Sequence, residues 1–167
     1  MNKFVILSMV SAIALSCTAM AKKPSVEPGK AAETSARQNI KVTVLNSPDV
    51  PLADYKGKVV LLNFWATWCP YCVKELPDLI QLYNKYKNKG FVILAVDLKE
   101  SPDTVKEFAA KNGMPYTLFI DSTGDIAKTY NVAGIPTNVF FNKKGEKVYQ
   151  DFTLPKDPEK FIEELLK

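Results

Sequence analysis

The apolar residues of this chain gather in short runs that turn-forming residues separate. Residues 59–65 are almost continuously apolar, and residues 91–96 repeat this pattern. Runs of this kind are typical of strands that are covered on both faces of a sheet. Four more runs predict further strands, which span residues 41–45, 116–120, 138–141 and 147–152. The turn-forming residues 142–145 join the last two runs and predict a hairpin.

Other stretches have the spacing of three and four residues that marks a helix. The longest predicts a helix from Pro70 towards Gly90, with a kink at Pro77. Its apolar positions are Val73, Leu76, Ile80 and Tyr83. Three further helices are predicted: from the N-cap Ser101 to Gly113, over residues 125–130 and over residues 158–166.

The order of these elements predicts the fold class. Strands that alternate with helices indicate a parallel core, and the late hairpin indicates an antiparallel edge. We therefore expect one α/β domain over residues 41–167, in which helices cover both faces of a mixed central sheet.

The N-terminus has the pattern of a targeting segment. Residues 1–21 combine Lys3, a short apolar stretch and the A-x-A pattern Ala19-Met20-Ala21, which predicts a secretory signal peptide that is removed after Ala21. A second interpretation is a lipoprotein signal that is cut before Cys17, which would then carry the lipid. Residues 22–40 lack a periodic pattern and predict a flexible linker. We expect export in either case, and membrane contact only if Cys17 is lipidated.

Composition excludes several kinds of site. The chain of 167 residues has no histidine and three cysteines. Histidine-dependent nucleophile activation is therefore excluded, and so are histidine metal sites and a four-thiolate zinc site within one chain. The formal charge of +4 is spread thinly and Arg37 is the only arginine, so a nucleic-acid partner has little support. We expect no metal and no cofactor.

The remaining chemistry lies in Cys69-Pro70-Tyr71-Cys72, between a predicted strand and a predicted helix. Two cysteines three residues apart on a helix lie on one side of it. Cys69 would stand at the helix N-terminus, where the helix dipole favours the reactive thiolate. Cys72, one turn further, would be shielded and would resolve a mixed disulfide on Cys69. A static bridge and half of a metal site are the alternatives.

The stretch 55–69, Tyr-Lys-Gly-Lys-Val-Val-Leu-Leu-Asn-Phe-Trp-Ala-Thr-Trp-Cys, strongly resembles the TlpA/ResA-type thioredoxin-like proteins, which are exported bacterial disulfide reductases. The resemblance covers residues 41–167 and includes Pro77 and the segment Ile135-Pro136-Thr137. It implies a thioredoxin-like three-layer sandwich with an inserted helix and strand at about residues 101–120. It also implies a cis Pro136 that faces the cysteines. The periplasm or the cell-envelope surface of a bacterium is the implied location.

The resemblance also suggests roles for residues around the cysteines. Ordinary thioredoxins carry a buried aspartate where this chain has Asn63, whereas the TlpA/ResA branch uses a glutamate at the position of Glu75. Glu75 is therefore our candidate proton acceptor for Cys72, and a surface glutamate is the alternative. The candidate substrate-binding residues are Trp68, Pro70, Tyr71, Ile135, Pro136 and Thr137, with Ile135 offering its backbone to an extended substrate chain. For Trp68 the alternative is core packing.

The expected partners are thiols and disulfides of envelope proteins, among them apocytochrome c, with a membrane thiol-electron transporter as donor. We expect a monomer. A peroxidase is less favoured, because such sites place a threonine where this chain has Ala66 and use an arginine for peroxide. A non-catalytic binding module predicts that Cys69→Ser leaves function intact. An oxidase or isomerase stays open, because the Pro70-Tyr71 dipeptide resembles that of the more oxidising glutaredoxins.

Overall fold

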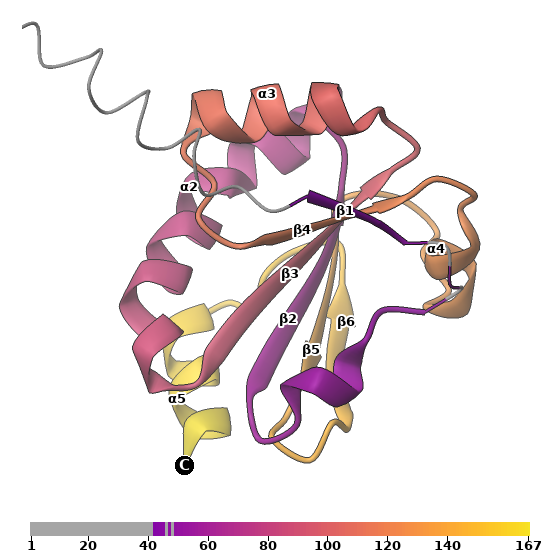
Figure 1. Ribbon diagram of the computed structural model, residues 1–167. Coiled ribbons are helices and arrows are strands. Elements are labelled where there is room, and N and C mark those ends of the chain that lie inside the picture. The colour runs from indigo at the N-terminus through magenta and orange to yellow at the C-terminus, as the bar shows by residue number, and fades with distance from the viewer. Residues whose placement is uncertain (1–41, 46, 48) are drawn as a thin grey trace, which may run out of the picture.

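A computed structural model describes residues 42–45, 47 and 49–167, so the predicted signal peptide, the predicted linker and Cys17 lie outside the described residues. The described part of the chain forms a mixed sheet in the order β1-β4-β3-β2-β5-β6 (Figure 1). The strands are β1 (Val42–Leu45), β2 (Val59–Trp65), β3 (Phe91–Leu98), β4 (Thr117–Asp121), β5 (Thr137–Phe141) and β6 (Lys147–Asp151). The first four in this spatial order are parallel, and β5 and β6 are antiparallel.

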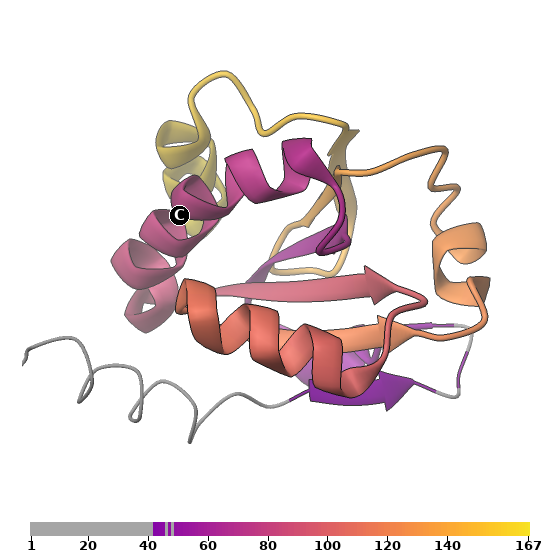
Figure 2. The ribbon, with the colours of Figure 1, turned by 90° about the horizontal axis from the view of Figure 1, so that it is seen from above.

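Helices cover both faces of this sheet, as Figure 2 shows from above. The four α-helices of the described residues are α2 (Pro70–Tyr86), α3 (Pro102–Asn112), α4 (Asp125–Thr129) and α5 (Pro158–Leu166). Two 3₁₀ turns accompany them, η1 (Leu52–Tyr55) and η2 (Lys87–Lys89). Buried residues of α2, α3 and α5 share one core cluster, and α4 and η1 pack on the other. The predicted α/β class with a mixed sheet is therefore confirmed.

The strand β2 illustrates why the sequence pattern predicts this arrangement. Its side chains alternate between the two core clusters, with Leu61 and Trp65 on one face and Leu62 and Phe64 on the other. Because both faces are covered, all seven residues are buried. A strand buried on both sides reads as a continuous apolar run rather than as an alternating one.

Several boundaries differ from the sequence-based expectation by one or two residues. The helix α2 ends at Tyr86 and continues as η2 to Gly90, whose φ of 98° ends the helical path. Pro77 lies inside α2 without interrupting the helix. The expected inserted helix and strand correspond to α3 and β4.

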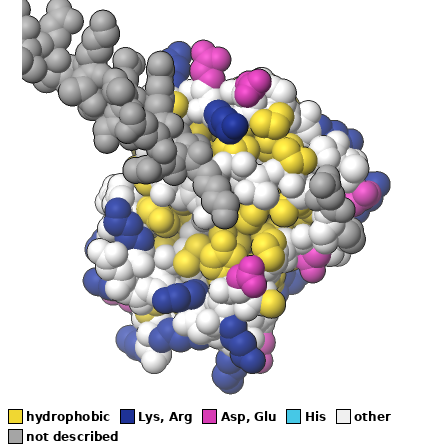
Figure 3. All heavy atoms as spheres, in the orientation of Figure 1, with side chains coloured by type: hydrophobic (Ala, Val, Ile, Leu, Met, Phe, Trp, Pro, Cys, Tyr) yellow, Lys and Arg dark blue, Asp and Glu magenta, His cyan; other side chains and the backbone are white. Residues whose placement is uncertain are grey.

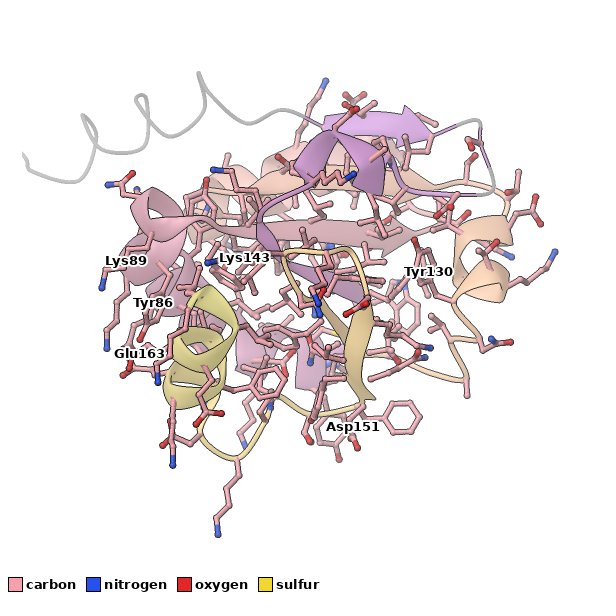
Figure 4. The ribbon with its side chains drawn as sticks, turned by 90° about the horizontal axis from the view of Figure 1, so that it is seen from below. Tyr86, Lys89, Tyr130, Lys143, Asp151 and Glu163 are labelled. Atoms are coloured by element: carbon pink, nitrogen blue, oxygen red, sulfur yellow. A yellow bond between two sulfur atoms is a disulfide. The ribbon has the colours of Figure 1, made fainter. Side chains whose placement is uncertain are left out.

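The C-terminal helix α5 is fastened to α2 by polar contacts at the edge of the core. Tyr86 donates a hydrogen bond of 2.8 Å to Glu163, and these two side chains lie side by side in Figure 4. Lys85 and Glu159 form an ion pair at 2.6 Å. Lys143, in the β5–β6 turn, donates to the carbonyl of Leu166. These contacts position the helix that covers β5.

Surface charge is interspersed rather than concentrated. Figure 3 shows lysine side chains around the rim of one face, acidic side chains between them and apolar side chains near its centre. No helix within the described residues is long and apolar enough to cross a membrane.

Asp121 is a buried carboxylate that organises the loop before α4. Its Oδ1 accepts from the Gly124 amide at 2.8 Å, and its Oδ2 accepts from the Ala127 amide at 2.9 Å. We expect Asp121→Ala to lower the free energy of unfolding by about 2–3 kcal/mol, because buried amides lose a charged acceptor. Urea unfolding measures this loss. Asp125→Ala removes an exposed side chain that pairs with Lys128, so it should lower the free energy of unfolding much less. Equal losses in both variants would contradict this account.

Candidate active site

The two cysteines lie where β2 passes into α2, and they form a disulfide. Cys69 is the N-cap of α2: its backbone is extended, and its Sγ accepts from the amide of Cys72 at 3.2 Å. Pro70 takes the first helical position, where an amide hydrogen would have no partner within the helix. The sulfur of Cys69 therefore sits in the positive field of the helix N-terminus, which favours its thiolate after reduction.

The two cysteines are buried, whereas the aromatic residues that flank them are exposed. In the disulfide form Cys69 is 3% exposed and Cys72 is 5% exposed, so helix position rather than exposure distinguishes the two. Trp68 and Tyr71, by contrast, are 66% and 74% exposed. Core packing of Trp68 is therefore excluded, whereas Trp65 is buried against Phe108. Two large aromatic surfaces flank a covered disulfide.

A second loop faces the cysteines from the antiparallel side of the sheet. The Ile135–Pro136 peptide bond is cis, as the family resemblance implies, and the Ile135 carbonyl oxygen lies 3.7 Å from Cys69 Sγ. The loop arrives there because β5, which follows it, pairs with β2 through Phe64 and Thr137. Thr137 is buried and its hydroxyl donates to Gly134, so its side chain braces the loop from inside and is not open to a substrate. A contact between Thr137 and a substrate, which the sequence predicts, would therefore have to use the backbone.

Glu75 lies one turn beyond Cys72 on α2 and ends a chain of buried amides. Asn63 of β2 donates to Asn138 of β5 at 2.9 Å, and Asn138 donates to Glu75 Oε1 at 2.8 Å. The other carboxylate oxygen is buried and makes no hydrogen bond of normal geometry within the described residues, although the Leu154 amide is near enough to Glu75 to lower its pKa. Burial raises the pKa of Glu75 to about 7, with Asp78 adding to the rise and Asn138 opposing it. Glu75 is thus a carboxyl group that can gain or lose a proton near neutral pH.

The sequence indicated Glu75 and Asn63 but not Asn138. These two asparagines stand directly opposite each other on neighbouring antiparallel strands. Each asparagine is a polar residue inside an otherwise apolar strand, and this pattern is a signal that the sequence offers. Only the register of β2 and β5 shows that the two asparagines face each other. The link between Asn63 and Glu75 therefore passes through a residue that only the structure identifies.

A groove of about 500 Å³ opens beside the cysteines. Tyr71, Ile135, Pro136 and Phe152 form its apolar part, and Glu75 lies in its wall. Phe152, which follows β6 and is 53% exposed, is a further residue that the sequence did not single out. Within the described residues no group of acidic or cysteine side chains could hold a metal ion. The site can exchange thiols and disulfides and can transfer a proton.

Comparisons with known proteins agree with this chemistry. The AhpC/TSA family model matches residues 30–150. The thiol-disulfide oxidoreductase ResA of Bacillus thuringiensis subsp. konkukian is 41% identical over 146 residues, which are 87% of this chain and 80% of the relative.

Solved structures extend the comparison. The thioredoxin domain of a thiol-disulfide oxidoreductase from Bacteroides vulgatus is 27% identical with a TM-score of 0.63, and the match covers 70% of this chain and 84% of that one. StoA from Bacillus subtilis is 31% identical with a TM-score of 0.56, and the match covers 65% and 82%.

Proposed function

The chain belongs to the AhpC/TSA family and, within it, to the ResA-type thiol-disulfide oxidoreductases of thioredoxin-like fold, and we propose that it acts as an exported disulfide reductase. The observation that carries the proposal is the placement of Cys69 at the N-terminus of α2, beside the cis-proline loop. Its partner Cys72 lies one helical turn before Glu75. The substrates are disulfides of envelope proteins.

The proposed reaction moves two electrons from the enzyme to the substrate. The Cys69 thiolate attacks one sulfur of the substrate disulfide, and the other substrate sulfur leaves and is protonated. The Cys72 thiol then gives its proton to ionised Glu75 and attacks Cys69 Sγ. The second substrate thiolate leaves, and the Cys69–Cys72 disulfide forms. A dithiol donor, which we propose is a membrane thiol-electron transporter, returns the enzyme to the reduced state.

The surface around the disulfide suits an extended protein segment. Trp68, Pro70 and Tyr71 offer exposed area on one side, and Ile135 and Pro136 lie on the other. We propose that the substrate lies across the Ile135 backbone as an added strand, with its cysteine above Cys69. Reduction of an apocytochrome c disulfide to its two thiols is one role that the ResA resemblance supports.

Location follows from the predicted processing of residues 1–21. A soluble periplasmic protein and a protein anchored through Cys17 are both compatible with the chemistry, because either route leaves Cys69 and Cys72 as the working thiols. An exported dithiol needs a donor that crosses the membrane, since the compartment around it is oxidising.

A second candidate direction is oxidation or isomerisation. The Pro70–Tyr71 dipeptide favours it, because couples with a glutaredoxin-type dipeptide are more oxidising than thioredoxin. The same residues would then run in reverse, with Cys72 as the leaving group. A peroxidase is not favoured, because Ala66 replaces the threonine of such sites and the single arginine lies outside the described residues.

The test is to trap the substrate. Cys72→Ser cannot resolve the mixed disulfide, so envelope proteins should accumulate on Cys69 and be released by reductant. Cys69→Ser is the matched control and should trap none. The reduced wild-type protein should also reduce insulin. The Cys69 thiolate can trap only a substrate that carries a disulfide, so trapping that increases in a more oxidising envelope would favour reductase action. Failure both to trap a protein and to reduce insulin would contradict the proposal.

A further inference from the structure

Glu100 accepts two hydrogen bonds from the loop that precedes Cys69. Its Oε2 accepts from the amide of Thr67 at 2.6 Å, and its Oε1 accepts from the Thr67 hydroxyl at 2.6 Å. Thr67 lies two residues before Cys69, on the segment that joins β2 to α2. Because β2 and β3 are parallel neighbours, the loops that follow them leave the same edge of the sheet. Glu100 therefore reaches across from the loop after β3 and holds the loop after β2 at two points.

The turn that presents Glu100 is itself held by a buried acid. Asp97 is fully buried at the end of β3, opposite Trp65 in the register, and its Oδ1 accepts from the Glu100 amide at 3.0 Å. Lys99, between them, has a φ of 68°, which is a costly backbone conformation for a residue with a side chain. Strained backbone persists where surrounding contacts enforce it, and it is common near functional sites.

The protonation of the two acids fits this arrangement. Asp97 Oδ2 is buried and has no hydrogen-bond partner among the described residues, so nothing there compensates a charge on this oxygen. Burial raises the pKa of Asp97, and the neighbouring Glu100 raises it further. Burial also opposes ionisation of Glu100, but hydrogen bonds with Asp97 and Thr67 outweigh it and lower the pKa of Glu100. Asp97 is thus held towards its neutral form, and Glu100 is the ionised acceptor for Thr67.

We propose that Glu100 is a positioning residue of the active site, which fixes Thr67 and thereby Trp68 and Cys69, and that Asp97 fixes Glu100. The inference rests on the proposed role of Cys69 as the attacking cysteine. Asp97 and Glu100 act through the loop and do not touch the substrate.

This role has a consequence for the redox equilibrium. In the oxidised protein the disulfide itself restrains Cys69. The dithiol lacks the restraint of the disulfide, and the two hydrogen bonds from Thr67 to Glu100 keep the loop in place. Without these hydrogen bonds, the dithiol gains more conformational freedom than the disulfide does, so the reduced form is favoured. The reduction potential should therefore rise when they are removed.

The test is a set of reduction potentials measured against a glutathione or dithiothreitol buffer. Thr67→Val removes the hydroxyl without changing charge, and Glu100→Ala removes both acceptors. We expect each to increase the ratio of dithiol to disulfide about fivefold to tenfold, which corresponds to about 20–30 mV for two electrons. The double variant should shift no further than Glu100→Ala alone, because both changes break the same contact.

Conservative replacements separate positioning from general destabilisation. Thr67→Ser keeps the hydroxyl, and Asp97→Asn keeps a side-chain oxygen that accepts from the Glu100 amide. Both should retain the wild-type potential. Unshifted potentials in Thr67→Val and Glu100→Ala would overturn the inference, and so would an equal shift in Thr67→Ser. The Thr67 pair decides the matter even if Glu100→Ala fails to fold. Failure of the proposed function is distinguishable, since it appears as disulfide exchange that survives Cys69→Ser.

Discussion

Replacing Glu75 by glutamine is expected to slow the resolution of the mixed disulfide about 100-fold or more, which is the usual scale of a positioned proton acceptor. Cys72 is nearly buried, so its thiol has poor access to water as a base. Glu75 lies one turn away on the same helix, and one of its oxygens makes no hydrogen bond of normal geometry within the described residues. Glutamine keeps the shape and the contact with Asn138 but cannot accept the proton.

The pH profile gives a sharper signature than the rate alone. The pKa of Glu75 is raised to about 7, so the fraction of ionised acceptor increases as pH rises through this value. The wild-type resolution rate should rise with it, and the inflection should be absent from Glu75→Gln. Asp78→Asn is the matched control: it removes a like charge that raises the pKa of Glu75, so the inflection should move to lower pH.

The measurement can use an aromatic disulfide whose thiol is coloured. Attack by Cys69 releases the first coloured thiol, and attack by Cys72 on the mixed disulfide releases the second. The second phase reports resolution directly. A wild-type second phase in Glu75→Gln across the whole pH range would show that another group, or water, takes the proton.

Stability should change with pH in a matching way. The pKa of Glu75 is higher in the folded protein than its ordinary value of 4.5, so folding favours the protonated form. The stability that this preference contributes is fully present below about pH 4.5 and is lost as pH rises through about 7. Glutamine does not titrate in this range, so the stability of Glu75→Gln does not fall for this reason. Its free energy of unfolding, relative to that of the wild type, should therefore rise between these two pH values.

The sequence predicts the sheet well because its central strands are buried on both faces. Residues 59–65 and 91–96 have the pattern that is typical of covered strands, and they lie in β2 and β3. The cysteine pair was equally plain, since its spacing and the strand before it both indicate the start of a helix. Local patterns of this kind depend on neighbours along the chain and need no knowledge of the fold.

Other parts of the site depend on contacts between distant segments. Asn138 meets Glu75 only because β5 pairs with β2 in one register, and Glu100 meets Thr67 only because two loops leave the same edge. Phe152 looks like an ordinary exposed aromatic until the fold places it in the groove. Family resemblance supplied Glu75 and the cis proline, but it did not single out Asn138 or the hydrogen bonds from Thr67.

Phe140→Ala is expected to lower the free energy of unfolding by about 3–5 kcal/mol, which is the usual cost of removing a large aromatic ring from a core. Phe140 is fully buried in β5. Its ring stacks on Phe91 at 6.4 Å and meets Tyr149 and Phe161 edge-on at 5.8 Å and 5.2 Å. It therefore joins the sheet to α5. Urea unfolding measures the loss, and Phe152→Ala, on an exposed aromatic after the next strand, should change stability by under about 0.5 kcal/mol.

The same substitution should also affect the active site, because alternate residues of a strand face the same side. Phe140 and Asn138 share a face of β5, and Asn138 holds Glu75. A cavity beside this strand should loosen Asn138 in the folded protein and broaden the inflection of the Glu75 pH profile. Phe152→Ala should do the reverse, leaving the profile intact while weakening substrate binding in the groove. A loss below about 1 kcal/mol in Phe140→Ala would mean that the neighbouring rings collapse into the space, and the Glu75 profile should then stay sharp.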